Sequence, residues 1–254
     1  MDIPEYRLDG KVALITGAGR GIGKGIAEVL AQAGADVIIN SLTATHVTPL
    51  AAELARSTGR RVVPLVADVT RADDVERAVA QVLLDFGKLD ILVNNLGDSI
   101  RGPLVSLSDH DLRFVMDVNL TTTILCTRAA GPHMLARGSG KVINVASFAS
   151  HRGGAGLSIY TTAKTALVGF TRAMALEWAP GGVQVNAVAP GYFPDAVTSG
   201  EAGYAERVQS AKTTVPLGRV GRLREVGLLC LYLAADASDY MTGQTLYLDG
   251  GVTL

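Results

Sequence analysis

Short apolar runs alternate with longer amphipathic stretches along the whole chain. Most runs are continuously apolar, which is typical of strands buried on both faces of a parallel sheet. We expect seven strands, at Val12–Thr16, Val37–Asn40, Val62–Val66, Leu89–Val93, Lys141–Ala146, Val183–Val188 and Thr245–Leu248. Between them, apolar residues at helical spacing predict helices at Gly23–Gln32, Ala72–Phe86, Asp109–Leu135, Ser158–Trp178 and Arg224–Ala234.

This alternation of strands and helices predicts an α/β fold, with a mostly parallel sheet covered by helices on both faces. No linker or shift in composition divides residues 1–254, so we expect a single domain. The stretch from Gly191 to about Val220 lacks clear periodicity. We expect a mobile or partly helical loop there, of the kind that often contributes to function.

The composition argues against several classes of function. The 254 residues are 48% hydrophobic, enough for one sizeable core. The net charge is −1 and no basic patch is visible, so neither nucleic acid nor a membrane surface is an expected partner. The first residues do not resemble a signal peptide and no apolar run reaches a membrane span of ~20 residues, which favours a cytoplasmic protein. Cys126, Cys230 and the scattered histidines indicate neither a disulfide nor a metal site.

Polar and glycine-rich segments follow the ends of the expected strands. Because the carboxyl ends of parallel strands lie at one edge of the sheet, where ligands bind, we expect these segments to meet there. They are the stretch from Thr16 to Gly23, Asp68, the pair Asn94 and Asn95, Ser147, and the pair Pro190 and Gly191.

The first of these segments, TGAGRGIG, lies between a strand and a helix, as a dinucleotide-binding loop does. Gly17 would allow a tight turn, Gly21 the approach of a pyrophosphate, and Gly23 close packing of helix on strand. The helix that follows would direct its positive N-terminal end at the phosphates. A glycine-rich segment alone can be just a tight turn, but its position between strand and helix favours nucleotide binding.

Ser147, Tyr160 and Lys164 have the chemistry of an acid–base site. Tyr160 and Lys164 are four residues apart, so on a helix they share one face. A free phenol has a pKa of about 10, and a nearby positive charge lowers it. Ser147 would hold a substrate oxygen while Tyr160 moves the proton, which suits carbonyl reduction or alcohol oxidation. The pair alone is weak evidence, because this spacing also occurs by chance.

Taken together, these motifs resemble the short-chain dehydrogenase/reductase family. They comprise TGAGRGIG, NNLG after the fourth strand, Asn119, Ser147, the Tyr160/Lys164 pair, and Pro190 with Gly191. The resemblance covers essentially the whole chain and is closest to compact reductases such as 3-oxoacyl-carrier-protein reductases and sugar-acid or polyol dehydrogenases. It implies a Rossmann-like, doubly wound sheet of seven parallel strands in the order 3-2-1-4-5-6-7.

The resemblance also implies a nicotinamide cofactor and a catalytic set of Asn119, Ser147, Tyr160 and Lys164. Tyr160 would be the general acid in reduction and the base in oxidation. Lys164 would lower the pKa of Tyr160 and bind the nicotinamide ribose, and Asn119 would support a water leading to solvent. The expected cofactor-binding residues are Gly17, Gly19, Arg20, Gly21, Ile22, Gly23, Ser41, Thr43, Asp68, Val69, Asn95, Leu96, Gly97, Tyr160, Lys164, Pro190, Gly191 and Phe193.

One position departs from the family pattern. Leu96 stands where the family usually has alanine, close to the cofactor, so its larger side chain would crowd the site. The backbone amide and carbonyl of Leu96 would remain available whatever the side chain. Cofactor affinity is therefore expected to be affected, and the fold is not.

Three segments are expected around the substrate. They contribute Asp98, Ser99 and Arg101, then His151 and Arg152, then Tyr192 and Phe193. Two arginines and a histidine indicate an anionic or polyhydroxylated substrate, unless these side chains simply face solvent.

The second strand carries the signal for cofactor choice. NAD enzymes of this architecture usually end that strand with an acidic residue that binds the adenine ribose. Ser41 occupies the position here, and Asp36 lies at the opposite end of the strand. Ser41 and Thr43 could bond a 2′-phosphate and Arg20 could supply charge, although no arginine follows Ser41. NADP(H) is therefore favoured over NAD(H).

The sequence thus predicts an NAD(P)-dependent oxidoreductase that moves hydride between the cofactor and a carbonyl or secondary alcohol. A 3-oxoacyl thioester and a sugar acid or polyol both remain open as substrates. Alternatives are a non-catalytic NAD(P)-sensing protein, which would be expected to lose Tyr160 or Lys164, and an epimerase or dehydratase, which would carry a further substrate domain. The resemblance also suggests a homotetramer formed through Asp109–Leu135, Ser158–Trp178 and the C-terminal strand.

Overall fold

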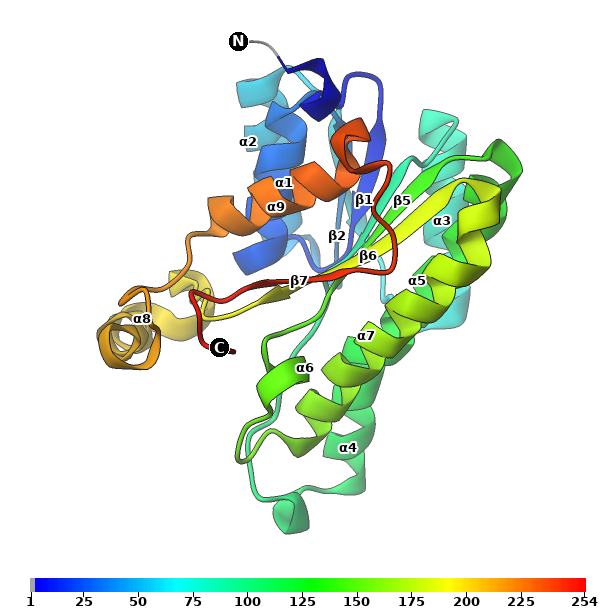
Figure 1. Ribbon diagram of the computed structural model, residues 1–254. Coiled ribbons are helices and arrows are strands. Elements are labelled where there is room, and N and C mark those ends of the chain that lie inside the picture. Colours follow the sequence, from blue (N-terminus) through cyan, green and yellow to red (C-terminus); the bar gives the residue numbers. More distant parts are fainter. Residues whose placement is uncertain (1–2) are drawn as a thin grey trace.

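A computed structural model describes residues 3–254, apart from the side chains of 196–199, 201 and 202. Seven parallel strands form one sheet in the order β3-β2-β1-β4-β5-β6-β7, which confirms the expected Rossmann-like topology (Figure 1). The strands are β1 Val12–Ile15, β2 Asp36–Ser41, β3 Val62–Val66, β4 Ile91–Asn94, β5 Gly140–Val145, β6 Val183–Pro190 and β7 Thr245–Leu248. Each differs from its predicted bounds by two residues at most.

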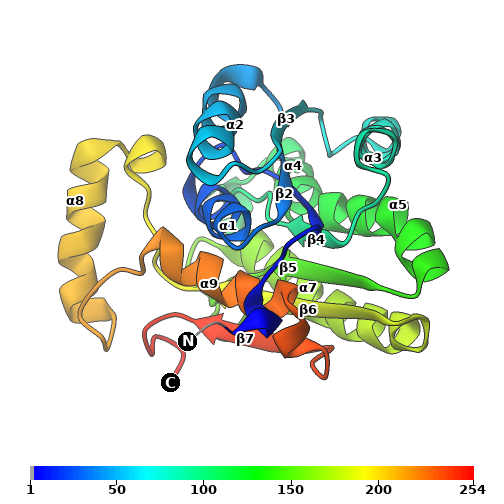
Figure 2. The same ribbon diagram turned by 90° about the horizontal axis from the view of Figure 1, so that it is seen from above.

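Helices cover both faces of the sheet (Figures 1 and 2). One face carries α1 Gly21–Gln32, α2 Ala44–Thr58 and α9 Leu223–Ala234. The other carries α3 Ala72–Phe86, α4 Asp109–Met116, α5 Thr122–Arg137 and α7 Ser158–Trp178. The short α6, Ala149–Arg152, precedes α7, and α8, Ala196–Thr214, stands apart from the sheet. A π-helical turn spans Asp117–Thr121, and 3-10 turns span Pro4–Tyr6, Leu104–Ser106, Ala179–Gly181 and Asp236–Ser238.

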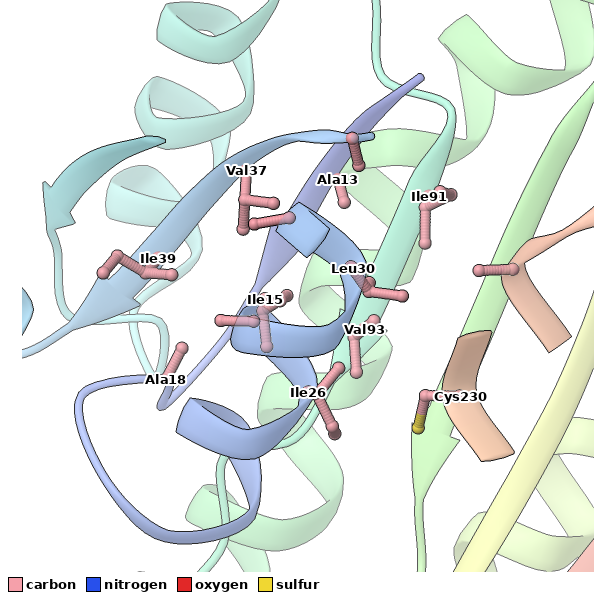
Figure 3. Packing of buried hydrophobic residues seen from close by; sticks show 14 of the residues in the cluster. Ala13, Ile15, Ala18, Ile26, Leu30, Val37, Ile39, Ile91, Val93 and Cys230 are labelled. Atoms are coloured by element: carbon pink, nitrogen blue, oxygen red, sulfur yellow. The ribbon is translucent and has the colours of Figure 1, made fainter. Parts of the chain in front are cut away.

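The central strands form the middle of two apolar layers. All residues of β1, β4 and β5 are buried, as the continuous apolar runs predict. Ile15, Ile26, Leu30 and Val93 meet between the sheet and α1 (Figure 3). The strands β3 and β7 are only partly buried because each has a neighbour on one side, so the expectation of burial on both faces is wrong for these two.

The helices differ from expectation in three places. The stretch predicted as one helix, Asp109–Leu135, is interrupted by the π-helical turn and ends at Arg137. The helix α2 was not predicted, because its threonines and Pro49 are poor helix formers. Much of the aperiodic stretch 191–220 is α8, with a non-helical break at Gly200. None of the described helices is long and apolar enough to cross a membrane.

The helices α1 and α9 touch through glycine. A Cβ on Gly227 would lie 2.5 Å from the Gly25 carbonyl oxygen and 2.6 Å from Val29 Cγ2. A Cβ on Gly25 would lie 2.6 Å from the Leu223 carbonyl oxygen. The two backbones therefore pack directly, and α1 is fixed behind the glycine-rich turn.

We predict that Gly227→Ala destabilises the fold by about 1–3 kcal/mol, because the added methyl must push two packed helices apart. The matched control is Gly169→Ala in α7, where an added Cβ would have no heavy atom within 4 Å. There alanine should be neutral or stabilise the helix by about 0.5–1 kcal/mol. Urea unfolding measures both variants, and equal midpoints for the two would contradict the predicted close contact.

Candidate active site

The carboxyl edge of the sheet brings the expected catalytic residues together. Ser147 follows β5 after one residue, Tyr160 and Lys164 lie on α7, and Asn119 lies on the π-helical turn. The amide of Phe148 donates to the Pro190 carbonyl at 3.0 Å, which ties the segment after β5 to the end of β6. Residues separated by more than 40 positions in sequence thus occupy one site.

Ser147 is buried, and its hydroxyl lies close enough to that of Tyr160 to lower the pKa of the phenol. Its Oγ also accepts a hydrogen bond from the Ala149 amide at 3.2 Å, which orients the hydroxyl. The serine is therefore positioned by the start of α6, and Tyr160 lies at its side. A substrate oxygen that reaches both hydroxyls would meet a proton donor and a second hydrogen-bond partner.

Lys164 is almost fully buried, with 3% of its surface exposed. Its Nζ donates to the Val145 carbonyl oxygen at 2.8 Å and lies 5.8 Å from the centre of the Tyr160 ring. Burial lowers the pKa of Lys164 from 10.5 to about 7, because an ammonium group loses its hydration there. Burial therefore favours the neutral amine far more than water does.

The pKa of Tyr160 differs from the expectation. Burial raises it above the usual 10, the hydrogen bond with Ser147 lowers it, and the charge of Asp98 raises it further. The expected lowering by Lys164 is not found, because the amine bonds to a backbone carbonyl and burial lowers its own pKa. Tyr160 is therefore held as a protonated phenol, the form that donates a proton.

Asn119 is completely buried and lies where the helix widens into its π-helical turn. Its Nδ2 donates to the carbonyls of Val115 at 2.8 Å and Asp98 at 2.6 Å. Its Oδ1 is buried without a hydrogen-bond partner. A Cβ on Gly97 would lie 2.6 Å from this oxygen and 3.0 Å from Lys164 Nζ, so both groups reach the same small space.

The glycine-rich turn is packed so closely that side chains at Gly17 and Gly23 would not fit. Gly17 has a φ of +61°, and a Cβ there would lie 3.0 Å from Leu96 Cα. A Cβ on Gly23 would lie 2.5 Å from Asn95 Nδ2. That amide group donates to the carbonyls of Thr16 at 2.9 Å and Gly17 at 3.0 Å and so braces the turn. The bare backbone at the start of α1 fits the phosphates of a dinucleotide.

The backbone of Leu96 is only partly available to a ligand, whereas the sequence predicted that both its amide and its carbonyl would be. Its amide donates to Thr16 Oγ1 at 3.1 Å and is therefore used within the protein, which leaves only the carbonyl for a ligand. Its side chain packs on the apolar layer beneath the sheet and against the Gly17 turn. Leu96 is therefore accommodated by packing inwards. The contact with the turn is close, because a Cβ on Gly17 would lie 3.1 Å from Leu96 Cδ1.

Three polar residues lie where the adenosine of the cofactor is expected; Arg20 and Thr43 are exposed and Ser41 is half-buried. Ser41 ends β2, Arg20 precedes α1, and Thr43 precedes α2 without capping it through its side chain. Asp36 lies at the far end of β2 and accepts a hydrogen bond from Arg60 at 2.9 Å, so it takes no part in the expected cofactor site. His46 was not among the predicted residues, because it is placed against the glycine-rich turn only by the unexpected helix α2. A Cβ on Gly19 would lie 2.9 Å from the Cβ of His46.

Other expected cofactor residues have structural partners. The Asp68 carboxylate accepts from the Thr70 amide at 3.0 Å and hydroxyl at 2.6 Å, next to the buried Val69. The Gly191 amide donates to the Leu248 carbonyl at 2.9 Å. Phe193 packs against the α1–α9 layer. Ile22 lies in the first turn of α1 and packs against the same layer.

The expected substrate residues do not all converge. Arg152 Nη1 donates to the Val252 carbonyl at 3.2 Å, and the His151 ring stacks edge-on against Tyr247 at 5.4 Å. Both point to the C-terminal segment. Tyr192 packs on Phe148 at 5.2 Å, and Arg101 is exposed. The charged side chain that acts on Tyr160 is Asp98. His151 and Arg152 therefore have partners within the protein, and their role at the substrate stays a prediction.

Comparison with known proteins agrees with this geometry. A family profile described as "Enoyl-(Acyl carrier protein) reductase" matches residues 17–253. The 2-dehydro-3-deoxy-D-gluconate 5-dehydrogenase of Bacillus subtilis is 39% identical over 97% of this chain and 96% of its own length. The 3-oxoacyl-(acyl-carrier-protein) reductase FabG of Thermotoga maritima is 36% identical over 98% of this chain and 100% of its own.

Solved structures are equally similar. A gluconate 5-dehydrogenase from Burkholderia cenocepacia, in complex with NADP and tartrate, has a TM-score of 0.91 and 37% identity, covering 98% of this chain and 97% of that one. A short-chain type dehydrogenase/reductase from Mycobacterium marinum has a TM-score of 0.92 and 36% identity, with 98% of both chains covered. The chain belongs to the short-chain dehydrogenase/reductase family of NAD(P)-dependent oxidoreductases.

Proposed function

We propose that the protein transfers hydride between NADP(H) and a carbonyl or secondary alcohol, with Asn119, Ser147, Tyr160 and Lys164 as its catalytic set. The observation that carries this proposal is that Ser147 and Tyr160 lie together beside the buried amine of Lys164, whose Nζ is 5.8 Å from the centre of the Tyr160 ring. A protein that only senses the cofactor has no need of a buried lysine next to an oriented phenol, since burial of that amine is costly.

Each side chain has a distinct task in this proposal. Tyr160 donates its phenolic proton to the substrate oxygen in reduction and removes it in oxidation, while Ser147 Oγ holds that oxygen in place. The cofactor supplies or accepts the hydride when bound. Lys164 Nζ, still bonded to the Val145 carbonyl, would bind the nicotinamide ribose and restore positive charge near the phenol.

The unpartnered Asn119 Oδ1 supports a further role in proton transfer. A buried amide oxygen without a partner is costly, and a water in the space beside Gly97 would satisfy it. The same space is reached by Lys164 Nζ. We infer that Asn119 holds a water through which the proton of Lys164 exchanges with solvent.

The cofactor assignment rests on the end of β2. No carboxylate stands at Ser41, so the 2′-phosphate of NADP would meet no repulsion there. Arg20 can add positive charge, and the Thr43 side chain is not used to cap α2. The similar gluconate 5-dehydrogenase of Burkholderia cenocepacia is in complex with NADP, which supports the same choice here.

The substrate is a secondary alcohol or its ketone. The similar proteins named for a sugar acid and for an acyl carrier protein support two classes, a polyhydroxylated substrate and a 3-oxoacyl thioester. We also infer that the chain acts as one domain and as a homotetramer. Exposed apolar side chains on α5 and α7, among them Ile124, Leu135 and Leu176, support association through these helices.

Tyr160→Phe should lower turnover by about 10²–10⁴-fold, because it removes the acid–base group and leaves the ring in place. Cofactor binding, followed by NADPH fluorescence, should be nearly unchanged. The assay is NADPH consumption with a panel of ketones, sugar acids and acyl thioesters, using the best substrate found for the wild type. A variant that keeps more than about a tenth of wild-type turnover, with chemistry rate-limiting, would show that Tyr160 is not the acid.

Ser41→Asp should move cofactor preference towards NADH by tenfold or more, which corresponds to about 1–3 kcal/mol, because a carboxylate would face the 2′-phosphate. The measurement is kcat/KM with NADPH and NADH for both proteins. Ser57→Asp, at the end of α2 away from the glycine-rich turn, is the control for added charge. A wild type that already prefers NADH, together with no change in the variant, contradicts the assignment.

A further inference from the structure

The segment that follows β7 lies between α8 and α6, where Figure 1 shows it as the red end of the ribbon. We call residues Gly250–Val252 the bridging segment. The Asp249 carboxylate fixes its shape by accepting hydrogen bonds from the Gly251 amide at 2.9 Å and from the Thr253 amide at 3.0 Å. Gly250 and Gly251 have φ values of +67° and +93°, which side-chain-bearing residues adopt only with strain. The bridging segment therefore has a defined conformation.

One side of the bridging segment packs against the end of α8 and the residues that follow it. The Leu217 amide donates to the Gly250 carbonyl at 3.1 Å, and a Cβ on Gly250 would lie 2.6 Å from Val215 Cγ1. Val252 is buried in one apolar cluster with Val215 and with Ala211 of α8. Movement of this end of α8 would therefore break a hydrogen bond and expose apolar surface.

The other side of the bridging segment is bonded to the helix that follows the proposed catalytic serine. Arg152, the last residue of α6, donates from Nη1 to the Val252 carbonyl at 3.2 Å. The beginning of α6 is bonded to Ser147. The Ala149 amide donates to Ser147 Oγ at 3.2 Å, and Ser150 Oγ donates to the Ser147 carbonyl at 2.6 Å. A displacement of α6 would therefore also move the hydroxyl that holds the substrate oxygen in the proposed reaction.

The position of α6 depends on such contacts, because the chain that follows it is rich in glycine. Gly153, Gly154 and Gly156 lie between α6 and α7, and glycine restricts the backbone least of all residues. Ser150 Oγ lies 3.2 Å from the Tyr247 hydroxyl, which joins the middle of α6 to β7. The end of α6 is joined to the bridging segment through its arginine. The helix is thus held by side-chain contacts on two neighbouring segments.

We propose that the bridging segment couples the position of α8 to that of Ser147, and that Arg152 is a positioning residue which acts through this coupling and does not bind the substrate. This inference rests on the proposed function, in which Ser147 holds the substrate oxygen. The segment that contains α8 is expected beside the substrate, so the two elements must keep a fixed relation while the substrate is bound. Because misplacement by about 1 Å can cost 10²-fold in rate, contacts outside the site affect turnover.

Arg152→Met removes the donor to the Val252 carbonyl and keeps much of the aliphatic side chain. We expect kcat to fall about 3- to 10-fold, because one partly exposed hydrogen bond is lost. The assay is NADPH consumption with the best neutral and the best anionic ketone of the panel. Both should be affected equally, and KM for NADPH should be unchanged. Arg152→Lys, which keeps a donor, should recover part of the lost turnover.

Val252→Ala tests the other side of the bridging segment. It weakens the apolar contact with α8 and leaves the carbonyl that Arg152 bonds. We expect a similar loss of kcat. If the two contacts act in series, the double variant should be about as slow as the slower single variant, because either change uncouples the same elements. Hydrogen exchange of the amides of α8, followed by mass spectrometry, should be faster in Arg152→Met, although that substitution is made in α6.

The matched control is Arg56→Met. Arg56 also donates to a backbone carbonyl, that of Ala52 at 3.3 Å, but it lies on α2. Its replacement should leave kcat and the exchange of α8 unchanged. NADPH fluorescence and thermal unfolding check that each variant is folded and binds cofactor.

A loss in Arg152→Met that is confined to KM of the anionic ketone would show that Arg152 binds the substrate. It would overturn this inference and leave the proposed function intact. Additive losses in the double variant, or unchanged exchange of α8 in Arg152→Met, would also overturn the coupling. Turnover of no ketone in the panel by the wild type would overturn the proposed function and this inference with it.

Discussion

Burial of one amine constrains the whole site. Lys164 is withdrawn from water, and its Nζ donates a hydrogen bond to the carbonyl of Val145, at the end of β5. An ammonium group in such a place is unfavourable, so its pKa falls to about 7. The amine is thus held close to the point at which it gains or loses its proton, and whatever brings negative charge or hydroxyl groups beside it will favour the charged form.

The rest of the site is arranged around this position. Gly97 has no side chain because Asn119 and Lys164 occupy the space that one would need. Asn119 can turn towards that space because the π-helical turn widens its helix there, and π-helical turns often occur at functional sites. Tyr160 lies one helical turn before the amine, near Ser147. The proton donor and the amine are therefore positioned by α7 and the unpartnered amide oxygen by the π-helical turn, and the two elements meet at one sheet edge.

Much of this could be predicted from the sequence, because the buried strands are continuously apolar and the polar residues follow their ends. The helix layers followed from the alternation of strands and helices, and the sheet order came from the family resemblance carried by those motifs. Other features depend on tertiary contacts that no local pattern records. The π-helical turn at Asn119 and the helix that carries His46 are of this kind. The pairing of Arg152 with Val252 is another, since it joins residues 100 positions apart. The pKa values of Tyr160 and Lys164 follow from burial, which spacing alone does not reveal.

The most direct test of this account is the pKa of Lys164 in the cofactor-free protein. NMR of the side chain in protein labelled at lysine gives the titration, and the signal is assigned by its loss in Lys164→Met. The account predicts a midpoint at about 7. Because the pKa of Lys164 is lowered by folding, the buried charge costs stability below pH 7, and this cost declines as the pH rises towards 10.5. A midpoint near the ordinary value for lysine, about 10.4, would contradict the claim that the amine is desolvated and would remove the basis of the proposed site.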